Sequence, residues 1–122
     1  MGKGAFITVE NKSNSLLKIE TGGENCMSTT GFWENLILPH TTSDRKYIEA
    51  KTSGIPCCCE TRTVMYGIEK LNSMTGEYTP ITIFNLNEEN NNWTSDVKTK
   101  SDAISITIQP GEEDLITITY NA

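Results

Sequence analysis

The chain has 122 residues, and its ten Lys and Arg against sixteen Asp and Glu give a formal net charge of −6 at pH 7. This acidic balance argues against a nucleic-acid-binding protein, which needs a basic surface, and against electrostatic docking on anionic lipid. No apolar run approaches the roughly 18–20 residues of a membrane-spanning helix. The length fits one domain with its own core, which we expect to comprise residues 1–122.

The composition favours β-structure. The chain contains 13 Ile and 17 Thr, eleven Asn and only four Ala. β-Branched residues suit the half-buried surface of a strand, Asn suits turns, and Ala is the favoured helix residue.

The first expected strands lie near the N-terminus. Ile7 and Val9 alternate with polar residues, the polar segment 11–15 follows, and Leu17 and Ile19 resume the alternation. Two period-2 segments separated by turn residues predict a hairpin.

Further strands are expected along the rest of the chain, with weaker candidates at residues 34–38, 45–51, 63–70 and 79–86. In the last of these, we expect Ile81 and Ile83 to share one face. Residues 87–100 are too polar to bury a helical face and are expected to form a long loop. In segment 103–120, isoleucines alternate with Ser and Thr around Pro110 and Gly111, which predicts a hairpin. The fold class expected is therefore all-β, a single-domain antiparallel β-sandwich.

An enzyme is not expected. His40 is the only histidine, and no partner for it can be identified from the sequence. The chain has no glycine-rich phosphate loop, no His-Glu-x-x-His element and no G-x-S-x-G element. Its acidic pairs lie between turn residues, where solvated carboxylates are common. We therefore expect no catalytic residues, no cofactor and no metal site.

The cysteines allow several interpretations. Cys57, Cys58 and Cys59 are consecutive and Cys26 is distant, which is poor spacing for zinc. A secretory signal is not recognised, so reduced thiols that act as small hydrophobic side chains are the default. A disulfide from Cys26 to one of the other three, or crosslinks between chains, are the alternatives.

Aromatic residues in polar surroundings are the candidates for lipid or sugar binding. They are Phe32, Trp33, Tyr78 and Trp93. An amphipathic ring suits both a membrane interface and the face of a sugar. Trp93 follows three asparagines and is the preferred candidate for an exposed anchor. Trp33 is followed closely by Leu36 and is the better candidate for the core.

Several short segments resemble the aegerolysins and the related actinoporin-like cytolysins. The segments are ITVENKSNSLLKI (7–19), LILPH (36–40), VMYGI (64–68), ITIFN (81–85) and NW (92–93). Size and N-terminus are most similar to the small aegerolysin-type component of two-part bacterial insecticidal toxins. The resemblance implies a β-sandwich that recognises a lipid or a cell-surface receptor.

The resemblance also implies partners. Only four residues precede the first expected strand, whereas actinoporins form their pore with an amphipathic N-terminal segment. A larger protein partner is therefore expected to open the pore, with homo-oligomers forming on the membrane. We expect synthesis in the cytoplasm, with inclusion bodies as one option, and action on target membranes outside the cell. A lectin-like sandwich and an inclusion-forming storage protein are the alternatives.

Overall fold

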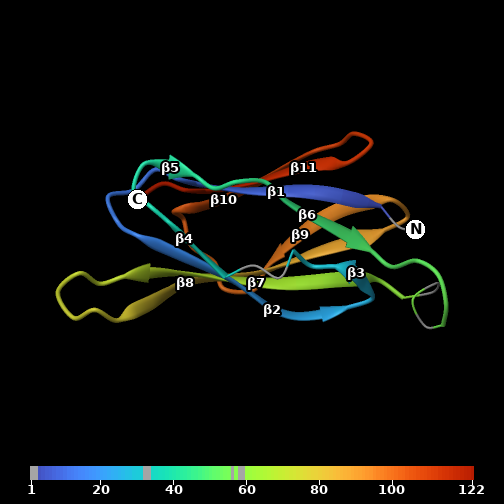
Figure 1. Ribbon diagram of the computed structural model, residues 1–122, viewed down its shortest axis with the longest axis horizontal. Helices are drawn as coiled ribbons and strands as arrows, with labels where there is room; N and C mark the ends of the chain where they lie inside the picture. Colours follow the sequence, from blue (N-terminus) through green and yellow to red (C-terminus); the bar gives the residue numbers. More distant parts are fainter. Residues whose placement is uncertain (1–2, 32–33, 56, 58–59) are drawn as a thin grey trace.

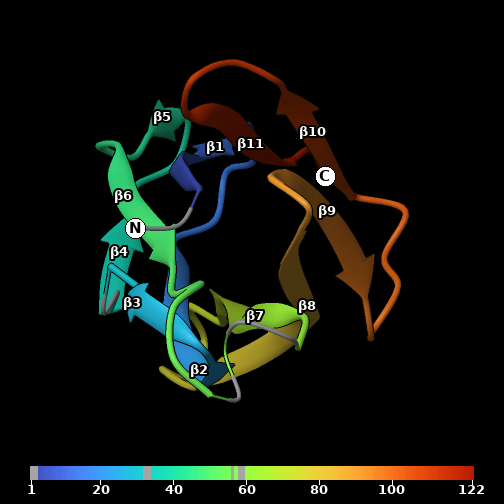
Figure 2. The same ribbon diagram turned by 90° about the vertical axis from the view of Figure 1, so that its right-hand side faces the viewer.

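The computed structural model describes residues 3–31, 34–55, 57 and 60–122, which form two β-sheets packed face to face (Figures 1 and 2). The prediction of an all-β sandwich is confirmed. The strands of the described residues are β1 (Gly4–Asn11), β2 (Leu17–Asn25), β3 (Met27–Thr29), β4 (Glu34–Ile37), β5 (Thr41–Thr42), β6 (Lys46–Ala50), β7 (Arg62–Leu71), β8 (Tyr78–Glu89), β9 (Asn92–Val97), β10 (Ile104–Gln109) and β11 (Asp114–Tyr120).

Six strands form one sheet and five form the other. The six-stranded sheet has the order β10-β11-β1-β6-β3, with β5 paired to β1, and the five-stranded sheet has the order β4-β2-β7-β8-β9. β1 and β11 pair in parallel, whereas the other pairs are antiparallel. The first and last strands of the chain therefore lie together in the middle of one sheet.

The core lies between the sheets and follows from the alternation of side chains along each strand. β11 shows the pattern most clearly, because its buried and half-buried positions alternate along its whole length. Ile116 and Ile118 of β11, like Ile7 and Val9 of β1, are at most 1% exposed. Full burial of such a side chain contributes about 1.5–3 kcal/mol. The polar residues between them face outward, as a half-buried sheet requires.

The C-terminal hairpin is confirmed, since β10 and β11 pair antiparallel without a break in register. The predicted N-terminal hairpin is wrong, because β1 and β2 belong to different sheets. The buried Asn11 side chain holds the segment in which the chain passes from one sheet to the other. Its Nδ2 donates to the carbonyls of Ser15, Ile37 and Leu38 at 2.8, 3.1 and 3.1 Å, and its Oδ1 accepts from the Ser13 amide at 3.0 Å. These bonds stabilise a corner instead of a two-stranded turn.

The prediction that Ile81 and Ile83 of segment 79–86 share one face is also wrong. Phe84 and Leu86 are fully buried, whereas Ile83 is 39% exposed. The register between β7 and β8 shifts at Ile81, which has no partner in β7. This bulge places Ile81 against the core and turns Ile83 to the outer face of the sheet.

Residues 87–100 form most of a hairpin, not the long loop predicted from their polarity. β8 continues to Glu89 and β9 begins at Asn92. The two residues between them, Asn90 and Asn91, have φ values of 54° and 65°. Left-handed conformations at both central residues suit the tight turn of a hairpin, and Asn tolerates them better than most residues.

Tyr66 crosses the core from one sheet toward the other. It lies on β7 and is fully buried, and its hydroxyl donates to the Thr30 carbonyl at 2.8 Å. Burial raises its pKa because the phenolate would lose its hydration. On the surface of the six-stranded sheet, Tyr47 donates to Glu49 Oε1 at 2.7 Å, and this hydrogen bond together with burial raises the pKa of Tyr47 to about 12.

These two shifts predict a loss of stability at alkaline pH. The unfolded tyrosines ionise near their ordinary pKa of about 10 while the folded ones stay protonated, so the free energy of unfolding falls as the pH rises above that value. We expect urea denaturation followed by circular dichroism to show this fall between about pH 10 and 12. The free energy of unfolding of the Tyr66→Phe variant should fall less steeply with pH. The same slope in both proteins would contradict this account.

Candidate functional site

The structure describes four of the eight candidate residues named from the sequence. These four are Cys26, Cys57, Tyr78 and Trp93, whereas Phe32, Trp33, Cys58 and Cys59 lie outside the described residues. Cys26 and Cys57 lie together, whereas Tyr78 begins β8 and Trp93 pairs with Glu88 near the other end of that strand, so the four do not form one site.

Trp93 is not an exposed anchor. It lies on β9, pairs with Glu88 of β8 and is 4% exposed. The period-2 alternation of the hairpin turns its indole into the core, where it packs with the residues of both sheets. The prediction that Trp93 stands in an exposed loop is therefore wrong.

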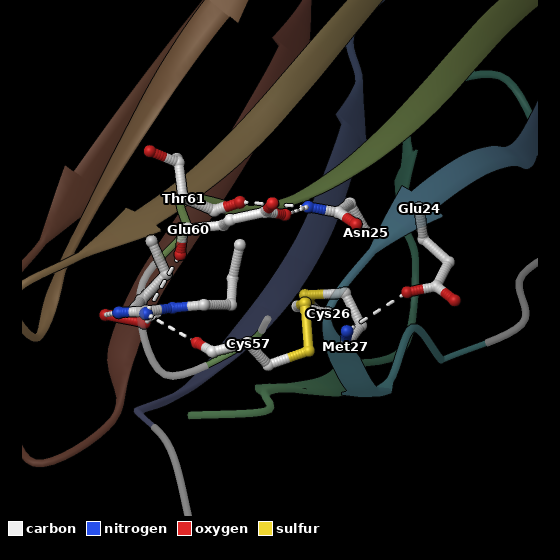
Figure 3. Close-up of a disulfide and its surroundings, with 9 residues drawn as sticks. Glu24, Asn25, Cys26, Met27, Cys57, Glu60 and Thr61 are labelled. Carbon is white, nitrogen blue, oxygen red and sulfur yellow. Dashed lines mark hydrogen bonds and ion pairs between the residues drawn. A yellow bond between two sulfur atoms is a disulfide. The ribbon is translucent and has the colours of Figure 1, made fainter. Parts of the chain in front are cut away.

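Cys26 and Cys57 form a disulfide, so the default expectation of reduced thiols is wrong for this pair (Figure 3). Their Cα atoms are 5.3 Å apart, and 31 positions separate them in the chain. The bond attaches the segment between β6 and β7 to the corner between β2 and β3. Beside it, Asn25 Nδ2 lies 3.3 Å from both Glu60 Oε2 and the Thr61 carbonyl.

A buried ion pair lies next to this disulfide. Arg62 Nε and Nη2 donate to the two carboxylate oxygens of Glu88 at 2.9 and 3.2 Å. Arg62 Nη1 also donates to the carbonyls of Cys57 and Glu60 at 3.1 and 3.0 Å. The Asn91 amide donates to Glu88 Oε2 at 3.0 Å. Because every contact of this pair is made within the fold, its role is structural.

A shallow trough on the outer face of the five-stranded sheet is the best candidate for a binding site. We call it the sheet trough, with a volume of about 230 Å³, and its lining includes Glu20, Met65, Gly67, Glu69, Pro80 and Ile83. A Cβ added at Gly67 would meet nothing within 4 Å. The missing side chain therefore helps to leave the trough open. Met65 and Ile83 leave 36% and 39% of their surface exposed beside it.

Tyr78 lies in a second hollow, which adjoins the sheet trough. This hollow has a volume of about 530 Å³ and is lined by Lys18, Glu34, Asn35, Leu36 and Tyr78. Lys18 Nζ lies 5.1 Å from the centre of the Tyr78 ring, within the range of a cation–π contact. It also lies 2.7 Å from Glu20 Oε1, which belongs to the trough. This ion pair links the hollow to the trough.

The charge of this surface is negative. Lys18 is surrounded by the carboxylates of Glu20, Glu34 and Glu69, which leaves an excess of acidic groups. The hydrogen bond to Glu20 and the attraction of all three carboxylates raise the pKa of Lys18, although desolvation opposes this. An apolar floor with carboxylates at its sides can accept a cation that carries apolar groups, and it repels anions.

Sequence reasoning missed both the trough and the ion pair, although each leaves a signal. A glycine inside a strand, such as Gly67 in the alternating segment around it, often marks a place where a ligand approaches. Glu88 lies an even number of residues from the buried Phe84 and Leu86, so it shares their face of the strand. Arg62 likewise shares the face of Val64. An acidic and a basic residue at core positions indicate a buried pair.

No family model matches the chain, and no curated protein matches it significantly. In the part of the chain that the structure describes, no helix is long and apolar enough to cross a membrane.

Proposed function

We propose that the chain is a non-catalytic recognition component that binds a membrane lipid with a neutral, choline-type headgroup through the sheet trough. In this proposal a larger protein partner opens the pore, as expected for a component of a two-part toxin. The observation that carries the proposal is that apolar residues beside Gly67 line the trough together with two acidic residues, Glu20 and Glu69.

The chemistry of the trough supports this class of ligand. A quaternary ammonium group combines a positive charge with a shell of methyl groups. The carboxylate of Glu69 would face the charge, with Glu20 nearby although it is paired with Lys18, and Met65, Pro80 and Ile83 would contact the methyl groups. Tyr78 adds an aromatic face at the edge of the surface, which quaternary ammonium groups favour. The net charge of −6 agrees with a headgroup that carries no net negative charge.

The lipid and the lectin interpretations both used Trp93 as an aromatic anchor, and Trp93 is buried. The lipid proposal rests on the sheet trough instead. Sugar binding and binding to a protein receptor are therefore treated as outcomes of the experiment below.

Gly67→Val is expected to weaken binding to phosphatidylcholine–sphingomyelin vesicles by at least about tenfold, because the new side chain fills the trough. The fold should tolerate it, since the added Cβ meets no neighbour. Valine should also raise the free energy of unfolding by about 0.5–1 kcal/mol, because glycine is unfavourable inside a strand. Vesicle cosedimentation and urea denaturation measure the two effects.

Thr94→Val is the matched control, because Thr94 is exposed on the same sheet but does not line the trough. It should bind vesicles like the wild-type protein. Equal binding of Gly67→Val and wild type, or binding to phosphatidylserine vesicles alone, would refute the proposal. Loss of vesicle binding on addition of free sugar would favour the lectin instead, and binding to cell membranes but to no vesicle would favour a receptor.

A further inference from the structure

β10 forms an unprotected edge of the six-stranded sheet. It is hydrogen-bonded to β11 on one side, and β9 of the other sheet is its neighbour on the opposite side (Figure 2). An edge strand presents unpaired backbone groups to other chains, and proteins normally protect such edges with charges, prolines, bulges or short length. No charge, proline or bulge lies within β10, whose sequence is ISITIQ, although Pro110 follows it directly and the loop before it binds the Ile104 amide. Its register with β11 is unbroken.

The other edges of the described sheets are protected. β4 has only four residues and begins at Glu34. β9 carries Asp96, which is paired with Lys98 at 2.7 Å. β3 has three residues and a shift in register, and β5 has two residues. β10 is therefore the edge on which pairing with another strand is least opposed.

The backbone of β10 is oriented for such pairing. The Ala103 carbonyl accepts from the amide of Asn121, the residue that directly follows β11, at 2.8 Å. The backbone polar groups of Ala103 therefore point toward β11. The backbone N–H and C=O groups of successive residues point to opposite sides of a strand. Those of Ile106 and Ile108, at odd separations from Ala103, therefore point away from β11. The Ile104 amide also points away and reaches the Ser101 carbonyl at 3.2 Å.

The side chains of β10 are complementary to a second copy of themselves. In an antiparallel pair centred on Ile106, this residue faces its own copy and Ile104 faces Ile108. Ser105 faces Thr107 on the outer side of the sheet. All three isoleucines pack against the core but remain partly exposed at the edge. A second β10 would cover this apolar strip.

The charges at the two ends of β10 do not oppose this orientation. Before the strand, Lys98 is paired with Asp96 at 2.7 Å and Lys100 is followed by Asp102, so this end carries no net charge, whereas Glu112 and Glu113 follow the strand. Antiparallel pairing therefore places the neutral end of each copy, and not its acidic end, beside the acidic end of the other.

We propose that β10 pairs antiparallel with β10 of a second copy of this chain, which joins the two six-stranded sheets into one. The interface is symmetric, and Ile106 exchanges both backbone hydrogen bonds with its own copy. The two-fold axis is perpendicular to the sheet, because facing residues stay on the same side. Both five-stranded sheets therefore lie on one side of the dimer, and their two troughs can contact one surface together.

Charge variants on the outer side of β10 test the dimer and its register. In Ser105→Lys/Thr107→Lys, the introduced lysines of the two copies face each other directly. In the matched variant Ser105→Glu/Thr107→Lys, opposite charges face each other. Both positions are exposed, so each variant should fold, and circular dichroism checks this. We expect sedimentation equilibrium to give twice the 13.5 kDa chain mass for the wild type and for the Glu/Lys variant. The Lys/Lys variant should have a dissociation constant at least about tenfold higher.

Three outcomes would overturn the proposal. A wild-type protein that stays monomeric up to about 1 mM contradicts the dimer. Equal weakening of the dimer in both variants contradicts the register, and an unchanged dimer in both places the interface elsewhere. None of these outcomes depends on whether the sheet trough binds lipid.

Discussion

Glu88→Ala is expected to lower the free energy of unfolding by about 3–5 kcal/mol, because it leaves the Arg62 guanidinium buried without its counter-charge. Glu88 is fully buried, and Arg62 is 9% exposed. Small proteins are usually stable by only about 5–15 kcal/mol, so this loss is a large part of the total. Urea denaturation measured by circular dichroism at pH 7 gives the value.

Two variants separate the ion pair from a general effect of losing a carboxylate. Glu89→Ala changes the exposed neighbour on the same strand and should alter stability by no more than about 0.5 kcal/mol. Arg62→Met/Glu88→Leu replaces both charges by apolar groups, and it should recover much of the stability lost in Glu88→Ala. A double variant that is less stable than Glu88→Ala would show that the hydrogen bonds of Arg62 to the backbone matter more than the charge pair.

Cys26→Ser is expected to lower the free energy of unfolding by about 3–4 kcal/mol under oxidising conditions. The disulfide closes a loop across 31 positions, and removing it releases the unfolded chain from that constraint. Cys26 is the better target because Cys57 has cysteine neighbours at 58 and 59 that could replace it in a disulfide. Denaturation in urea with and without reductant measures the effect.

Reductant provides the control for this second prediction. It should destabilise the wild-type protein by about as much as the substitution does and should leave the stability of Cys26→Ser unchanged. A wild-type protein that is indifferent to reductant would contradict the role of the bond. The Cys57 carbonyl accepts from Arg62, so the disulfide and the ion pair share a neighbour. The combined variant Cys26→Ser/Glu88→Ala should therefore lose less stability than the sum of the two.

The candidate site could be predicted from the sequence only in part. The sequence predicts Tyr78 as a candidate because it is an aromatic residue near a turn, and Tyr78 lines the hollow beside the sheet trough. Glu20, Gly67 and Glu69 come from β2 and β7, and the sequence does not show that these two strands are neighbours. Trp93 was assigned to the wrong environment, because the polarity of its neighbours concealed a hairpin whose outer side is polar. The partner of Cys26 was one of three possibilities, and spacing could not choose among them.

The sequence by itself determined the fold class and the positions of most strands. Period-2 alternation, as in Ile104 to Ile108, arises from the local geometry of a single strand and requires no knowledge of its neighbours. Only the tertiary structure decided which strands pair. The parallel pairing of β1 with β11 joins the two ends of the chain, and the side-chain hydrogen bonds of Asn11 separate β1 from β2. The alternation of apolar and polar residues indicates that one face of a strand is buried, but it does not indicate which sheet covers that face. The sheet trough and the unprotected edge at β10 follow from that pairing, so they became visible only in the folded chain.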